Sequence, residues 1–155
     1  MADTKLFANN ILAVIPSDDH DVPNFSGPRE SGTTTATTAS KLVNSAATFE
    51  SSGIKAGAII YNTTDSTSTT VTAVDSDTTL SVTDDIFASG EDYIIFTESA
   101  RDVALYIGGS GTLKVTASGG GTETFTGMLP GMFFPVNVKR VFATGTSATL
   151  IIALI

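Results

Sequence analysis

The chain has 155 residues and a net charge of -8, with 15% charged and 41% hydrophobic residues. An acidic chain is a poor ligand for nucleic-acid phosphates, and the lack of cysteine excludes disulfides, thiolate nucleophiles and zinc–thiolate sites. About a quarter of the residues are serine or threonine, which favours strands and hydroxyl-rich turns. We therefore expect an all-β protein in which another chain covers some apolar surface; the alternative is a monomer with a well-filled β core.

The first forty residues contain one predicted strand and much turn-forming sequence. Residues 11–15 form a short apolar run, and Pro16, Pro23 and Pro28 favour extended, looping backbone after it. Residues 33–40 belong to a run of small polar residues that buries too little to fold alone. We therefore predict a linker at 33–40.

Residues 41–97 are predicted to form a separate small β-barrel or meander. Leu80 and Val82 alternate with hydroxyl-bearing residues, as in a half-buried strand. Four candidate strands are separated by polar turns and cover residues 58–62, 69–74, 79–83 and 93–96.

Residues 98–155 are predicted to form five strands joined by consecutive hairpins. Glycine runs at 108–111 and 119–121 and the pair Pro130-Gly131 are typical of tight turns, and Pro135 favours an edge or a bulge. The candidate strands cover residues 103–107, 112–116, 123–126, 133–142 and 148–155. The last of these is far shorter than the roughly 20 apolar residues of a membrane span.

These segments combine into one predicted architecture. Residues 1–32 and 98–155 form a jelly-roll-like β-sandwich base that contacts other chains. The β module of residues 41–97 is inserted into this base after the linker.

No grouping of reactive side chains predicts catalysis. Residues 17–21 are the only stretch in which serine, histidine and carboxylates meet, but neighbours along an extended segment seldom converge as a triad requires. A solvated turn, with Ser17 or Asp18 capping the local backbone, is the preferred interpretation. The glycine runs lack the lysine and the following helix of a phosphate-binding loop. We expect neither an enzyme nor a cofactor.

The acidic turns at residues 75–77, 84–85 and 91–92 could supply oxygen ligands for calcium. Their spacing does not match an EF-hand loop, which requires glycine at its sixth position and glutamate at its twelfth. We therefore expect turn acids and no metal site, with an adventitious ion as the alternative.

The densest apolar group lies between residues 128 and 134. Phe133 and Phe134 are neighbours in a predicted strand and face opposite sides, so one of them is a candidate anchor of an intersubunit contact; burial between two sheets is the equal alternative. The only basic pair follows in the same strand and could meet an acidic capsid surface or pair with a neighbouring subunit, although a lone basic pair on a strand is usually solvated. The candidate interface residues are Met128, Leu129, Met132, Phe133, Phe134, Lys139 and Arg140.

Three parts of the chain carry a resemblance to a known family. They are Pro-Ser-Asp at 16–18, ALYIGGSGTLKV at 104–115, and the positions Gly131, Pro135, Val138, Arg140, Val141 and 143–146. Together they resemble the head spike-base proteins of gene transfer agents and related tailed phages. The resemblance covers residues 10–28 and 101–155, about half of the chain.

The resemblance implies a small β-sandwich protein on the capsid exterior, made in the host cytoplasm and without enzymatic activity. Its implied partners are copies of itself, the major capsid protein and a spike fibre, with no nucleic acid and no membrane. It would be a decoration (cement) protein, with the homotrimer favoured, or a spike base, with a homopentamer.

The chain departs from the family in one respect. Family members pass almost directly from the proline-rich segment to the strand of Tyr106, whereas about 70 residues intervene here. These extra residues resemble a β module common in phage structural proteins. A second hypothesis is a receptor- or glycan-binding module of a tail fibre or adhesin, which the absence of tryptophan disfavours.

Overall fold

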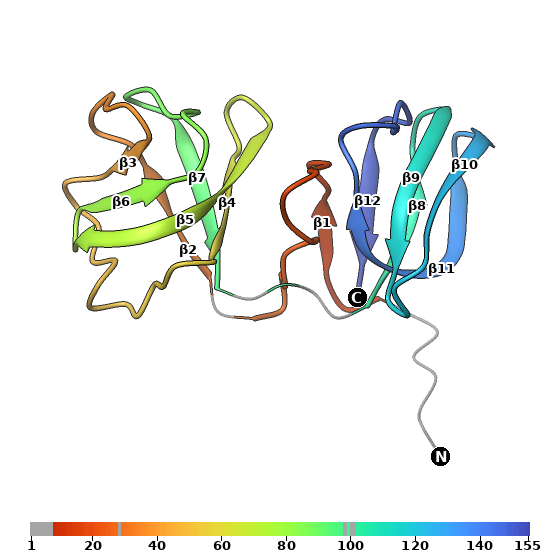
Figure 1. The fold of residues 1–155 in the computed structure, drawn as a ribbon, viewed down its shortest axis with the longest axis horizontal. Coiled ribbons are helices and arrows are strands. Elements are labelled where there is room, and N and C mark those ends of the chain that lie inside the picture. The colour runs from red at the N-terminus through yellow and green to blue at the C-terminus, as the bar shows by residue number, and fades with distance from the viewer. Residues whose placement is uncertain (1–7, 28, 98, 100–101) are drawn as a thin grey trace, which may run out of the picture. The chain divides into compact units, whose positions relative to one another are not determined.

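The computed structural model describes residues 8–27, 29–97, 99 and 102–155, and within these ranges the chain contains strands and no helix. It divides into two compact units, each built on one curled antiparallel sheet of six strands (Figure 1). The base comprises Met1–Ser26 and Ala100–Ile155, and the module comprises Gly27–Ser99. The predicted all-β, sandwich-like fold class is confirmed. Of the residues assigned to the predicted base, 1–7, 28, 98 and 100–101 lie outside the described ranges.

The base sheet has the strand order β1-β12-β8-β11-β9-β10. Its strands are β1 (Ile11–Ala13), β8 (Val103–Ile107), β9 (Gly111–Ala117), β10 (Thr122–Met128), β11 (Met132–Val141) and β12 (Ile151–Leu154). The long strand β11 pairs with β8 through its first half and with β9 through its second half. The register shifts between Phe134 and Val138, which confirms the bulge expected at Pro135. A strand that changes partners at a bulge forms the corner of a sandwich.

The sequence predicted a hairpin turn at the glycine run of residues 108–111, and this prediction is wrong. β8 and β9 are not neighbours, because β11 lies between them. The glycines instead permit close packing: a Cβ on Gly108 would lie 2.7 Å from the Cβ of Leu150, and one on Gly111 would lie 2.5 Å from the backbone nitrogen of Ala148. Within the described base, β9 and β10 are the consecutive strands that pair directly, so a chain of hairpins does not describe this unit.

The module sheet has the order β2-β7-β4-β5-β6-β3. Its strands are β2 (Arg29–Thr33), β3 (Lys41–Val43), β4 (Ile59–Asn62), β5 (Thr67–Ser76), β6 (Thr79–Val82) and β7 (Asp92–Phe96). The segment after β2 joins β3, because Thr35 N donates to Val43 O at 2.8 Å and Ala36 bridges Val43. The sheet therefore closes on itself. Its interior contains Leu42, Phe49, Ile54, Ala58, Ile60, Val71, Leu80, Val82, Phe87, Tyr93 and Ile95.

The linker predicted at residues 33–40 is wrong, because this segment is an integral part of the module. Thr34 is 2% exposed, its backbone N–H donates to Glu91 O at 2.8 Å, and its hydroxyl accepts from Glu91 N at 2.9 Å. The hydroxyl of Thr37 accepts from Ser89 N at 2.9 Å. Hydroxyl groups that satisfy neighbouring backbone groups hold this polar segment in place without apolar burial.

Candidate interaction surface

The structure separates the predicted interface residues into buried and exposed ones. Met128 and Phe134 are each 5% exposed, and the ring of Phe134 packs edge-on against that of Phe125, with centroids 4.8 Å apart. Leu129 and Phe133 are 60% and 67% exposed, and Met132 is half-buried. The prediction that Phe133 and Phe134 face opposite sides is confirmed. Phe133 is the one available to another chain.

Arg140 is engaged within the base. Its Nε donates to Asp21 Oδ1 at 2.7 Å and its Nη1 donates to Asp18 O at 3.1 Å. The backbone N–H of Val22 donates to the carbonyl of Lys139 at 2.8 Å. These contacts fasten the segment of residues 14–22, which follows β1, to the second half of β11.

The same segment contains the residues considered for a catalytic triad. The hydroxyl of Ser17 accepts from Asp19 N at 3.1 Å, the local capping role expected for it. Hydrogen bonds from Thr144 to the carboxylate of Asp18 lower the pKa of Asp18. His20 is 7% exposed, and this burial lowers the pKa of its imidazole. The contacts of this segment are therefore structural: they attach it to β11 and to Thr144.

The outer face of the base sheet is apolar over four neighbouring strands. Directly opposed residues in antiparallel strands share a face, so the register defines its rows. One row is Ala13, Ile152, Tyr106 and Phe133, and the next is Ile11, Leu154 and Ala104. We call these seven residues the apolar face. It carries no charged side chain, and the alternate residues of the same strands, such as Leu105 and Ala153, are fully buried.

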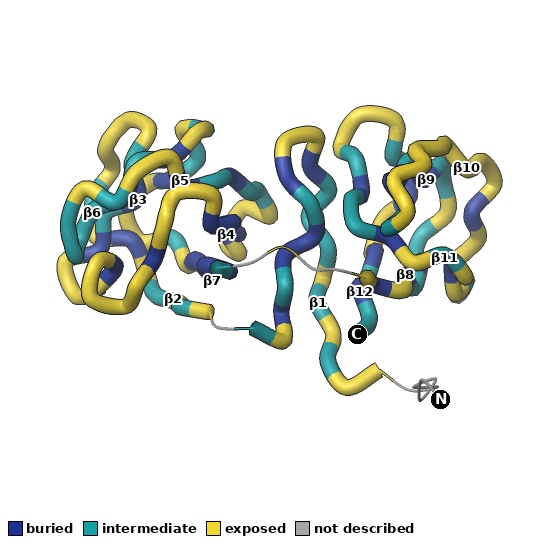
Figure 2. Tube along the Cα trace, turned by 60° about the horizontal axis from the view of Figure 1, so that its bottom comes forward, coloured by how far each residue is buried: buried dark blue, intermediate teal, exposed yellow. Residues whose placement is uncertain are grey.

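Four residues of this face are exposed and three are half-buried; the half-buried ones are Tyr106, Ile152 and Leu154. Ile11 is 65% exposed, and Phe133, on the opposite side, packs edge-on against Tyr106 at a centroid distance of 5.4 Å. In the described ranges, every exposed large hydrophobic side chain belongs to the base. Besides Ile11 and Phe133, these side chains are Phe125, Leu129 and Leu150. The edge strand β10 is also exposed along most of its length (Figure 2). Sequence reasoning missed Ile11, Tyr106, Ile152 and Leu154, although their strands were predicted.

The charge of the chain is divided unequally between the two units. Residues 27–99 contain ten acidic and three basic residues, a net charge of -7. The base contains six acidic and five basic residues, a net charge of -1. The nearly neutral unit is therefore the one that exposes apolar side chains.

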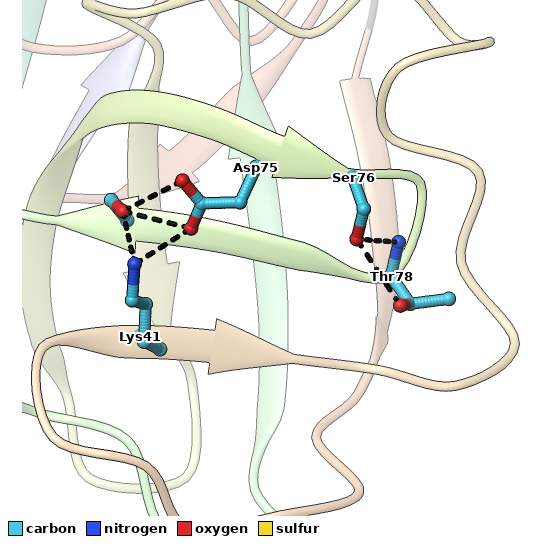
Figure 3. A network of polar contacts seen from close by, with 5 residues as sticks. Lys41, Asp75, Ser76 and Thr78 are labelled. Atoms are coloured by element: carbon cyan, nitrogen blue, oxygen red, sulfur yellow. Dashed lines mark hydrogen bonds and ion pairs between the residues drawn. The ribbon is translucent and has the colours of Figure 1, made fainter.

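The acidic turns of the module bond to their own surroundings. The carboxylate of Asp75 accepts from Lys41 Nζ at 2.7 Å (Figure 3). It also accepts from the Ser81 hydroxyl at 2.8 Å. The hydrogen bond from Lys41 is the main cause of the lowered pKa of Asp75. Asp77 accepts from Ser51 N at 2.8 Å, and Asp84 accepts from the Thr69 hydroxyl at 3.0 Å.

One open pocket of about 440 Å³ in the module is bordered by Asp65, Asp85 and Glu91. A hydrogen bond with Glu91 raises the pKa of Asp65. The Glu91 carboxylate also accepts from Asn62 Nδ2 at 2.9 Å and from Ala88 N at 2.8 Å. Across the described parts of the chain, no three histidine, aspartate or glutamate side chains are grouped so that they could hold a metal ion.

No known protein family, curated protein or solved structure matches the chain. In the ranges that the structure describes, no helix has the length and apolar character needed to cross a membrane.

Proposed function

We propose that this chain is a non-enzymatic structural protein of a phage virion, located on the capsid exterior as a decoration protein or spike base. The proposal is carried by one observation: among the residues that the structure describes, the exposed large hydrophobic side chains all belong to the nearly neutral base. The base is also the unit that contains the segments resembling head spike-base proteins. A surface of this kind suits permanent contact with other chains, because water-exposed apolar side chains favour burial.

The mechanism that follows is stabilisation by binding. A protein that contacts only the assembled shell shifts the equilibrium toward the assembled state by its binding free energy. The acidic module gives each copy a like charge, which opposes uncontrolled stacking of decorated particles. No chemical step is required of any residue. A ring of three copies suits a decoration protein, and a ring of five suits a spike base.

The alternative of a glycan-binding module has less support from the aromatic residues. Sugar-binding sites commonly use exposed aromatic rings, but Tyr61 and Tyr93 are 2% and 1% exposed. Tyr106 is half-buried against Phe133. A signal on a glycan array would favour this alternative.

The test is attachment to particles. Purified protein is mixed with capsids that lack it, the particles are sedimented, and bound copies are counted. We expect saturable binding, with a copy number that distinguishes vertices from a lattice-wide coat. Failure to bind intact capsids, together with turnover of a substrate, would refute the proposal.

A further inference from the structure

We propose that a small pocket beside the start of β2 binds an alkylammonium ion, with the carboxylate of Glu30 as its counter-ion. Among the described residues, the pocket is bordered by Arg29, Glu30, Ser52, Ile54 and Thr97, and its volume is about 240 Å³. All five residues belong to the module. The inference goes beyond the proposed function and does not depend on it.

The side chain of Glu30 is on the interior side of the module sheet. Glu30 lies directly opposite Ile95, which is 0% exposed and part of the apolar interior, and directly opposed residues of antiparallel strands share a face. Burial raises the pKa of Tyr93, another interior residue, and the charge of Glu30 adds to this rise. A carboxylate therefore stands at the edge of an otherwise apolar interior.

One oxygen of this carboxylate has no partner. Oε2 of Glu30 is buried and forms no hydrogen bond, and no ion pair in the described parts of the chain includes Glu30. The neighbouring Arg29 lies opposite Phe96, on the other face of the strand, because successive residues of a strand face opposite sides. A buried carboxylate oxygen without a hydrogen bond is costly, so a ligand that donates to it is favoured.

The surroundings of Glu30 define the chemistry of the ligand. An ammonium group has three donors, of which Glu30 Oε2 can accept one and the hydroxyl of Ser52 another. The Ser52 hydroxyl bonds to that of Thr48 at 3.0 Å and retains acceptor capacity. Ile54, which is 5% exposed, offers apolar contact to a short alkyl chain. The module, with a net charge of -7, attracts cations and repels anions.

The size of the pocket and its single carboxylate limit the ligand further. Sites for drug-sized ligands have volumes of about 300–1,000 Å³, so this pocket suits a smaller molecule. Calcium prefers about six to eight oxygen ligands, which one carboxylate and two hydroxyl side chains do not supply. A short primary amine fits both limits, and we expect a dissociation constant on the order of 1 mM. A free amine and the lysine side chain of a partner carry this same group.

The first experiment is a nuclear magnetic resonance titration of the nitrogen-15-labelled full-length chain with butylammonium chloride. Butanol is the matched neutral ligand, and sodium chloride controls for ionic strength. We expect saturable shifts of the amides of Glu30, Ser52 and Ile54 with butylammonium only. Nα-acetyl-lysine amide presents the same group on a peptide backbone: equally tight binding assigns the pocket to a partner's lysine side chain, and binding of butylammonium alone assigns it to a free amine.

The second experiment repeats the titration with three variants. Glu30→Gln keeps the shape of the side chain and removes its charge, and the affinity should fall at least about tenfold. Asp92→Asn is the matched control, because it removes the same charge from an exposed position of the module outside the pocket, and the affinity should change by less than about twofold. Arg29→Gln removes a like charge from the border, so the affinity should stay constant or rise.

Several outcomes would overturn the inference. Shifts that do not saturate by about 50 mM, or equal shifts with butanol, do so in the parent chain without any variant. An unchanged affinity in Glu30→Gln also overturns it, and weaker binding in Arg29→Gln would assign the pocket to a ligand with a negative group instead. Capsid attachment is measured separately, so loss of either result leaves the other standing.

Discussion

Adjacent phenylalanines in β11 give a direct test of which side of the base sheet is the core. Phe134 is 5% exposed and packs on Phe125, whereas Phe133 is 67% exposed and contacts Tyr106. Replacing a buried phenylalanine with alanine costs about 3–5 kcal/mol, since burial is lost and a cavity remains. Phe125 is itself 37% exposed, so the cavity left by Phe134→Ala opens partly to water and we expect a cost of about 3 kcal/mol.

Phe133→Ala is the matched control for this substitution. It removes the same atoms from the next residue, but mainly an edge-to-face ring contact is lost, and we expect a cost of about 0.5–1 kcal/mol. The assay is urea unfolding followed by far-ultraviolet circular dichroism at low micromolar concentration, where self-association does not contribute. Hydrogen exchange of the amides in β4 and β7 serves as an internal control, because these strands belong to the module and should be unaffected.

The reasoning is refuted if the two variants lose equal stability, or if Phe134→Ala costs less than about 1 kcal/mol. Either result would mean that the side of the sheet assigned to the core is wrong. The apolar face would then be an interior surface, and the proposed assembly through the base would lose its support.

Three further predictions concern polar contacts. Burial lowers the pKa of His20 in the folded chain, whereas in the unfolded chain the imidazole titrates near the ordinary value of 6.5. The stability of the parent chain should therefore fall as the pH drops through 6.5 toward the lowered native pKa. Urea unfolding midpoints measured across this pH range should fall less in His20→Asn than in the parent chain. Thr34→Val removes the hydroxyl that accepts from Glu91 N and donates to Ala88 O, and should destabilise the module by about 1–3 kcal/mol in thermal unfolding; an unchanged transition would restore the linker interpretation. Lys41→Met removes an exposed ion pair, so nuclear magnetic resonance titration should show the pKa of Asp75 rising toward its ordinary value while stability changes by less than about 1 kcal/mol.

Strands with regular alternation were predictable from the sequence. The pattern Val103-Ala104-Leu105-Tyr106-Ile107 alternates between buried and more exposed positions, and the predicted bounds agree with β8. The same holds for Leu80 and Val82 in β6. Period-two burial leaves a direct mark on composition because the two faces of such a strand meet different surroundings.

Strands stabilised by polar groups were not predictable. β2 reads Arg-Glu-Ser-Gly-Thr and contains no apolar residue, yet all five of its residues pair with β7. Residues 34–37 bond to Glu91, Val43 and Ser89 through backbone and hydroxyl groups. Such bonds depend on which strands become neighbours in space, and composition carries no record of that.

The candidate surface shows the same limit. The sequence identified the apolar cluster at 128–134 but could not say which side of the sheet was covered, so it grouped the buried Met128 and Phe134 with the exposed Leu129 and Phe133. Ile11 and Leu154 lie far apart in the sequence and join the same face through the pairing of β1 with β12. A surface assembled from β1, β8, β11 and β12 becomes visible only with the sheet order.

The unequal division of charge between base and module supports an assembly role on physical grounds. If the chain acted alone, nothing would favour placing the exposed hydrophobic side chains and the low charge in the same unit. Contact with water disfavours exposed hydrophobic side chains, and a low net charge on the same unit does not offset that cost. When copies associate through the base, both features act in one direction: apolar burial stabilises the contact, and the small charge of -1 limits repulsion across it. The module, at -7, needs no such contact because its hydrophobic side chains already fill the interior of a closed sheet.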